Sequence, residues 1–163
     1  MNREQTPESA GLREEGGDLG RTVVTIANSH LDAPLASNQA KSLSICGSTL
    51  PSVSVANSTG FVLIGGAKDD GGPAACGPNV ISGNVTLRDN TAGIELGADT
   101  ISGSVVLTNN TGQRPDSDKA GPEVEANHIG AFLVCSGNTP VPVDDNQPNT
   151  VAGRAIGQCA GLA

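Results

Sequence analysis

Two glutamates are the first residues in this sequence whose type and spacing could do chemistry. Glu95 lies between Ile94 and Leu96, and Glu123 precedes Val124 in a segment that aligns with it. If these segments form adjacent strands of a parallel sheet, the two carboxyl groups stand about 5 Å apart, as in retaining glycosidases. Because the flanking residues are apolar and alternate with them, we expect both carboxylates to point outward into solvent.

The other candidate groups point less clearly to a reaction. Three loop segments carry pairs of acidic residues, namely Asp69 and Asp70, Asp116 and Asp118, and Asp144 and Asp145. Their spacing matches neither a twelve-residue EF-hand loop nor a calcium-binding nonapeptide repeat, so we predict no metal site. His30 and His128 lie far apart and near no recognisable nucleophile, so we interpret them as surface or turn residues.

The elements that must position these groups belong to an internal repeat. The segment ISGNVTLRDNTAGIELGADT (81–100) is followed at once by ISGSVVLTNNTG, which gives a period of about 20 residues. The alignment extends upstream to VSVANSTGFVLIGG, downstream to EVEANHIGAFLVCSGNT, and weakly to a first copy that places Val24 and Ile26 in the columns of Val85 and Leu87. About five turns result, with longer insertions at 67–79 and 112–121.

Within each copy, short runs alternate apolar and polar residues, which is the pattern of β-strands. Stacked copies would pair their strands in parallel and bring equivalent aliphatic side chains into internal columns. The expected columns are Val53, Val85, Val105 and Leu133; Val55, Leu87, Leu107 and Cys135; and Ile64, Leu96 and Val124. A narrow interior of this kind suits a chain with only two aromatic residues, and Asn90, Asn110 and Asn138 would share one turn where their amides bond along the stack.

This pattern resembles the right-handed parallel β-helix of the pectin-lyase-like superfamily in its short-repeat form. The resemblance covers residues 22–150 and rests on ISGNVTL, ISGSVVL and the asparagine column, while the segment CSGNTPVPVDDNQPNTVAGRAIGQC is similar to the end of short secreted bacterial proteins of this type. It implies an all-β solenoid, but the superfamily includes lyases, hydrolases, adhesins and spike proteins. The polysaccharide lyases of that superfamily suggest Arg88, Asp89 and Asp99 as sources of charge or calcium ligands beside Glu95.

The four cysteines favour an oxidising compartment. Without a CxxC spacing a zinc site has little support, and Cys135 with Cys159 would tie the carboxyl-terminal tail over the end of the stack as a cap. Cys46 and Cys76 would then form the second disulfide, although four reduced thiols in a cytosolic protein are the alternative. Residues 1–21 have no signal-peptide pattern and are predicted to be a flexible acidic tail before a single domain at 22–163. We nevertheless expect a secreted or cell-surface protein.

Charge and hydropathy restrict the partners. Nine basic and seventeen acidic residues give a formal net charge of −8, which argues against a nucleic-acid partner, and no apolar run is long enough to span a membrane. We predict a non-catalytic extracellular binding or structural module without a cofactor, whose partner is a polysaccharide or another component of the cell envelope. The alternative is a polysaccharide lyase or glycoside hydrolase that uses Glu95, Glu123 and Arg88. A trimeric spike component would need an outer apolar face, for which only Leu63, Val106 and Val134 qualify.

Overall fold

A computed structural model describes residues 22–66, 76–112 and 121–163, and within these ranges the protein is built from β-strands without any helix. The predicted acidic tail, 1–21, lies outside the described residues, as do Asp69, Asp70, Asp116 and Asp118. No helix in the described part is long and apolar enough to cross a membrane.

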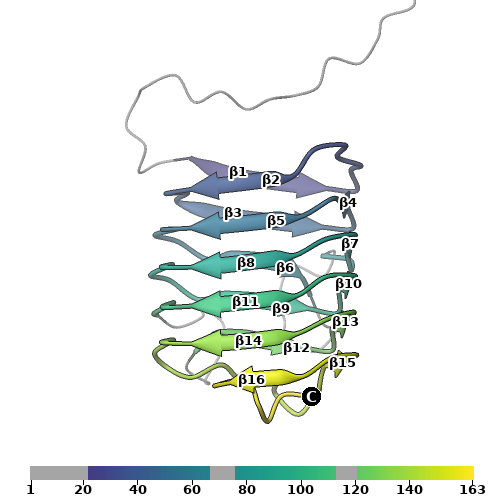
Figure 1. The fold of residues 1–163 in the computed structure, drawn as a ribbon. Helices are drawn as coiled ribbons and strands as arrows, with labels where there is room; N and C mark the ends of the chain where they lie inside the picture. Colours follow the sequence, from purple (N-terminus) through teal and green to yellow (C-terminus); the bar gives the residue numbers. More distant parts are fainter. Residues whose placement is uncertain (1–21, 67–75, 113–120) are drawn as a thin grey trace, which may run out of the picture.

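The strands form three parallel sheets, and every full circuit of the chain adds one strand to each of them (Figure 1). Sheet A contains β1 (Val23–Ala27), β3 (Ser42–Cys46), β6 (Val62–Gly65), β9 (Ile94–Gly97) and β12 (Glu123–Glu125). Sheet B contains β4 (Thr49–Leu50), β7 (Val80–Ile81), β10 (Thr100–Ile101), β13 (His128–Ile129) and β15 (Thr150–Val151). Sheet C contains β2 (Leu35–Asn38), β5 (Val53–Ala56), β8 (Val85–Arg88), β11 (Val105–Thr108), β14 (Leu133–Ser136) and β16 (Ala155–Gly157).

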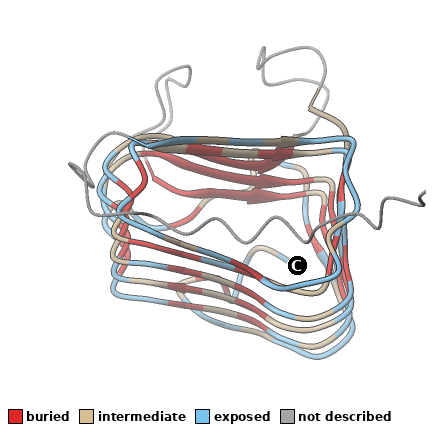
Figure 2. Ribbon diagram, turned by 90° about the horizontal axis from the view of Figure 1, so that it is seen from above, coloured by how far each residue is buried: buried red, intermediate tan, exposed pale blue. Residues whose placement is uncertain are grey.

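The register of these sheets is the one that the repeat predicts. In sheet C, Val85 pairs with Val105 and Val105 with Leu133, and in sheet A, Ile64 pairs with Leu96. The side chains of all three predicted columns are buried, and they belong to one core cluster enclosed by the stacked circuits (Figure 2). Aliphatic residues therefore form the core, because a strand spacing of about 4.8 Å brings each one directly onto its equivalent in the next circuit.

The beginning of the repeat differs from the prediction. Val24 pairs with Leu43 and Ile26 with Ile45, so both belong to sheet A and not to the column of Val85 and Leu87 in sheet C. An isolated V-T-I run fits any column by alternation, and only its hydrogen-bonded partner strand fixes its place. Because β2 and β16 add further strands at the two ends, sheet C has six strands, one more than the predicted number of turns.

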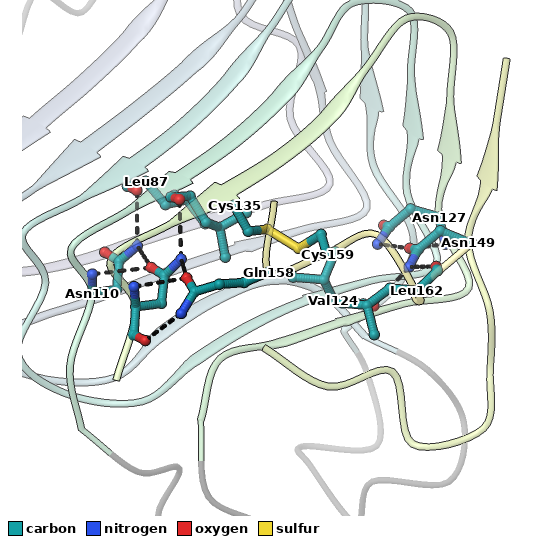
Figure 3. The surroundings of a disulfide bond; sticks show 11 residues. Leu87, Asn110, Val124, Asn127, Cys135, Asn149, Gln158, Cys159 and Leu162 are labelled. Carbon is teal, nitrogen blue, oxygen red and sulfur yellow. Dashed lines mark hydrogen bonds between the residues drawn. A yellow bond between two sulfur atoms is a disulfide. The ribbon is translucent and has the colours of Figure 1, made fainter. Parts of the chain in front are cut away.

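Both predicted disulfides are present. Cys46 is bonded to Cys76, and Cys135 is bonded to Cys159, which is buried at the end of the stack (Figure 3). Beside this bond, Gln158 donates from Nε2 to the carbonyl oxygen of Asn138 at 2.8 Å and accepts at Oε1 from the Asn138 backbone N–H at 2.9 Å. The tail after β16 is therefore both covalently linked and hydrogen-bonded to the last circuits.

Candidate functional site

Glu95 and Glu123 are brought together as the repeat predicts. They are direct partners on the adjacent parallel strands β9 and β12, and Glu125 follows on the same strand opposite Gly97. Their side chains lie on the outer side of sheet A, because the residues that alternate with them, Leu96 and Val124, point into the core. Three carboxylates are therefore gathered on one sheet within two circuits.

The expectation that these glutamates face solvent was wrong. Glu95 is 2% exposed, and Glu123 and Glu125 are 0% exposed. Glu95 lies against Gly66 and close to Cys76, which the disulfide links to Cys46 at the end of β3. Since none of the three carboxylates lacks a partner, the cluster is part of the packed structure and not an open acid pair.

Arg88, Asp89 and Asp99 are not gathered around Glu95. Arg88 ends β8 in sheet C, where its side chain is 56% exposed and its Nη1 lies 3.3 Å from Asp89 Oδ2. Asp99 lies at the opposite end of β9 from Asp89, at the turn between sheets A and B, and is buried. Hence no arrangement of Glu95 with Arg88 and a calcium ligand is formed by these residues, and no group of three or more His, Cys, Asp or Glu residues that could hold a metal ion occurs within the described ranges.

The predicted asparagine column is confirmed at the turn between sheets C and A. Asn90 Nδ2 donates to Asn110 Oδ1 at 2.9 Å, and Asn110 Nδ2 donates to Asn138 Oδ1 at 2.9 Å. Each amide also donates to a strand carbonyl of the preceding circuit, as Asn110 does to Leu87 O at 2.9 Å (Figure 3). These amides satisfy backbone groups where the chain bends out of the sheet, so each of these turns is held to the next circuit by the same hydrogen bonds.

A second column, which the sequence analysis missed, occupies the turn between sheets A and B. Its members are Ser48, Asn79, Asp99, Asn127 and Asn149, all buried. From Ser48 to Asn149, each backbone N–H donates to the side chain of the residue one circuit further, and Asn149 closes the series on Leu162 O at 3.0 Å. Every member of this column directly precedes a strand of sheet B, which is the signal that the sequence offered, but the residue type changes among serine, asparagine and aspartate along the column.

The outer face of sheet C is open, in contrast to that of sheet A. We define the sheet C face as two adjacent outward columns of this sheet. The first contains Ser54, Thr86, Val106, Val134 and Ile156, and the second contains Asn84, Ser104, Phe132 and Arg154. Phe132 is 46% exposed and Ile156 is 44% exposed, and Arg154 is also exposed. Leu63, named with Val106 and Val134 as outward apolar residues, is instead buried at 5% on sheet A.

Phe132 is a surface aromatic that the sequence analysis did not single out. Its backbone N–H donates to Ser104 Oγ at 3.3 Å, and the Leu133 N–H donates to Arg154 O, so Phe132 is flanked by Ser104 and Arg154 on the neighbouring circuits. The signal was available, because Phe132 directly precedes the inward Leu133 and alternation places it outside. The two histidines lie elsewhere, His30 within 3.2 Å of Asp32 and His128 exposed on sheet B.

Comparisons with known proteins do not connect the chain to a family: no family model, no curated protein and no solved structure matches it. The geometry described above therefore carries the functional argument.

Proposed function

We propose that this protein is a right-handed parallel β-helix that acts outside the cell as a non-catalytic binding or structural module, with an extended polysaccharide of the cell envelope as its partner. Right-handed winding is supported by the general rule for crossovers between parallel strands. Two disulfides support an oxidising, extracellular environment.

The observation that carries the non-catalytic part of the proposal is the burial of Glu95 and Glu123. A glycosidase pair must reach the glycosidic bond with one carboxyl group and water or the sugar with the other. At 2% and 0% exposure, the two glutamates have no surface to offer a polymer. Arg88, the third residue of the enzymatic alternative, belongs to sheet C while both glutamates belong to sheet A.

The sheet C face is the surface that suits a polymer. Its strands stack in parallel over six circuits, which gives a long, repeating surface instead of a pocket. Phe132 offers an aromatic ring for packing against the apolar side of a sugar ring, and Arg154 and Asn84 in the same column offer hydrogen-bond donors on either side. The described part of the chain has three basic residues, Lys41, Arg88 and Arg154. Because Arg88 ends β8 and Arg154 directly precedes β16, two of these three positive charges lie at sheet C, where they could attract an anionic sugar.

Co-sedimentation with insoluble polysaccharides and isolated cell walls tests the proposal. We expect the wild-type protein to bind at least one polymer, Phe132→Ala to weaken binding about tenfold, and Val80→Ala, at an equally exposed apolar site on sheet B, to bind like wild type. No binding to any polymer, or equal binding by both variants, would refute the proposed face.

The same incubations test the enzymatic alternative. The appearance of new reducing or unsaturated sugar ends, lost in Glu95→Gln, would replace the module by a lyase or hydrolase. We expect binding without such ends.

A further inference from the structure

Asp99 is the only acid in a column whose other members are amides and a serine. Its Oδ1 accepts hydrogen bonds from the Asn79 backbone N–H at 2.6 Å and from Asn79 Nδ2 at 3.1 Å, and its own N–H donates to Asn127 Oδ1 at 3.0 Å. In these three contacts Asp99 does what an asparagine does. The difference lies in the second terminal group of the side chain, which is NH₂ in asparagine and Oδ2 in Asp99.

The neighbouring circuits show what that NH₂ group would bind. Asn79 Nδ2 donates to Ile45 O at 3.0 Å, and Asn127 Nδ2 donates to Leu96 O at 2.8 Å and to Asn149 Oδ1 at 2.9 Å. Ile64 pairs with Ile45 on one side and with Leu96 on the other. Its carbonyl oxygen is therefore the acceptor that an NH₂ group at position 99 would bind. By this register, the side chain at position 99 faces two acceptors, Ile64 O and Asn127 Oδ1.

An ionised carboxylate has no proton to give to either acceptor. Asp99 is 1% exposed, so water does not compensate, and among the described residues Oδ2 has no hydrogen-bond partner. A neutral carboxylic acid, in contrast, carries an O–H that can donate as the amide does. The hydrogen-bonding pattern of the column therefore calls for the protonated form.

The neighbouring elements offer no positive partner to the ionised form. Glu95 on the same circuit and Glu123 and Glu125 on the next are acidic, and His128, whose N–H donates to Asp99 O, is exposed on the outside of sheet B. No described basic side chain bonds to Asp99. Burial raises its pKa from 3.8 to about 7, against the opposing effect of the hydrogen bonds from Asn79.

We propose that Asp99 makes the contact between circuits depend on pH. When protonated, it completes the column between sheets A and B; when ionised, it loses the side-chain hydrogen bond to Asn127, the fourth member, and loosens the contact of adjacent circuits. The unfolded chain releases this proton near pH 3.8, whereas the folded chain keeps it until about pH 7. The folded state thus binds more protons between these values, and stability falls as the pH rises through this window.

Two measurements test this proposal. In ¹³C NMR of the wild-type protein, the Asp99 carboxyl carbon should titrate near pH 7, assigned by its absence in Asp99→Asn. In equilibrium unfolding, the unfolding constant of wild type relative to Asp99→Asn should rise with pH, by up to about tenfold per pH unit between about pH 4 and 7. The control Thr100→Ala, an exposed neighbour, should keep the wild-type pH dependence.

Titration of the Asp99 carboxyl near pH 4 would overturn the proposal, as would an Asp99→Asn protein whose stability follows pH just as that of wild type does. The NMR result stands even if the variant folds poorly, because the Asp99 carboxyl carbon can then be assigned in the wild-type protein through its connection to the backbone resonances of residue 99.

Discussion

Glu95 and Glu123 are paired in register on β9 and β12, and both side chains are enclosed on the outer side of sheet A. The pair has the repeat spacing that suggested catalysis, yet it is sealed from any polymer. Carboxylates in such a place act on the stability of the fold, since their desolvation must be offset by interactions within the protein.

Replacing Glu123 by alanine should therefore lower stability without affecting polymer binding. The side chain is fully enclosed and has a partner, so truncation leaves both a void and an unsatisfied group, and we expect a loss of about 3 kcal/mol. Urea unfolding measures the loss, and co-sedimentation under native conditions measures the binding. A variant of wild-type stability that no longer binds polymer would contradict this role.

Asn110→Ala should be strongly destabilising because one side chain joins three circuits. Its Nδ2 donates to Leu87 O and Asn138 Oδ1, and its Oδ1 accepts from the Asn90 backbone at 3.1 Å and from Asn90 Nδ2. We expect a loss of about 3 kcal/mol in urea unfolding, since buried partners are left unsatisfied. Thr100→Ala, at an exposed position, should change stability by less than about 0.5 kcal/mol. Similar effects of the two changes would argue against the importance of the column.

Gly65→Ala tests the close contact between circuits beside Asp99. Gly65 has a φ of +65°, and a Cβ there would collide with the carbonyl oxygen of Gly97 and the carboxyl group of Asp99. We expect a thermal midpoint lower by several degrees, because both backbone strain and a clash with backbone are introduced. Gly161→Ala is the matched control, since a Cβ at Gly161 meets nothing within 4 Å. An unchanged midpoint for Gly65→Ala would mean that adjacent circuits separate more easily than the structure indicates.

The Cys135–Cys159 disulfide should stabilise the end of the stack. Replacing both cysteines by serine opens a loop with a sequence separation of 24 residues, which corresponds to about 3 kcal/mol by the chain-entropy estimate. Hydrogen exchange should show the largest loss of protection at β16, which pairs with β14 alone among the described strands. Equal protection of β16 in the variant and in wild type would show that Gln158 and its hydrogen bonds hold the tail without the disulfide.

Much of the fold was predictable because the repeat fixes which residues are equivalent. Val85, Val105 and Leu133 lie one above another in sheet C as expected, and the Asn90, Asn110 and Asn138 amides bond along their column. In contrast, Val24 and Ile26 were assigned to the wrong sheet, since a short alternating run carries no information about its partner strand.

The amino-acid sequence by itself determined the parallel pairing and the aliphatic columns, because both follow from the period of the repeat and the alternation of side chains. The two cysteine pairs rested on a separate argument, in which Cys135 and Cys159 tie the tail over the end of the stack and Cys46 and Cys76 remain as the second pair. Only the tertiary structure decided which outward faces are open. Glu95 and Thr86 both alternate outward on their strands, yet Glu95 is buried and Thr86 is half-buried on the sheet C face. Alternation tells which side of a strand a residue is on, but the exposure of that side depends on what packs against it in the folded chain. The burial that raises the pKa of Asp99 likewise exists only in the folded chain, where the turn column places Asp99 between Asn79 and Asn127.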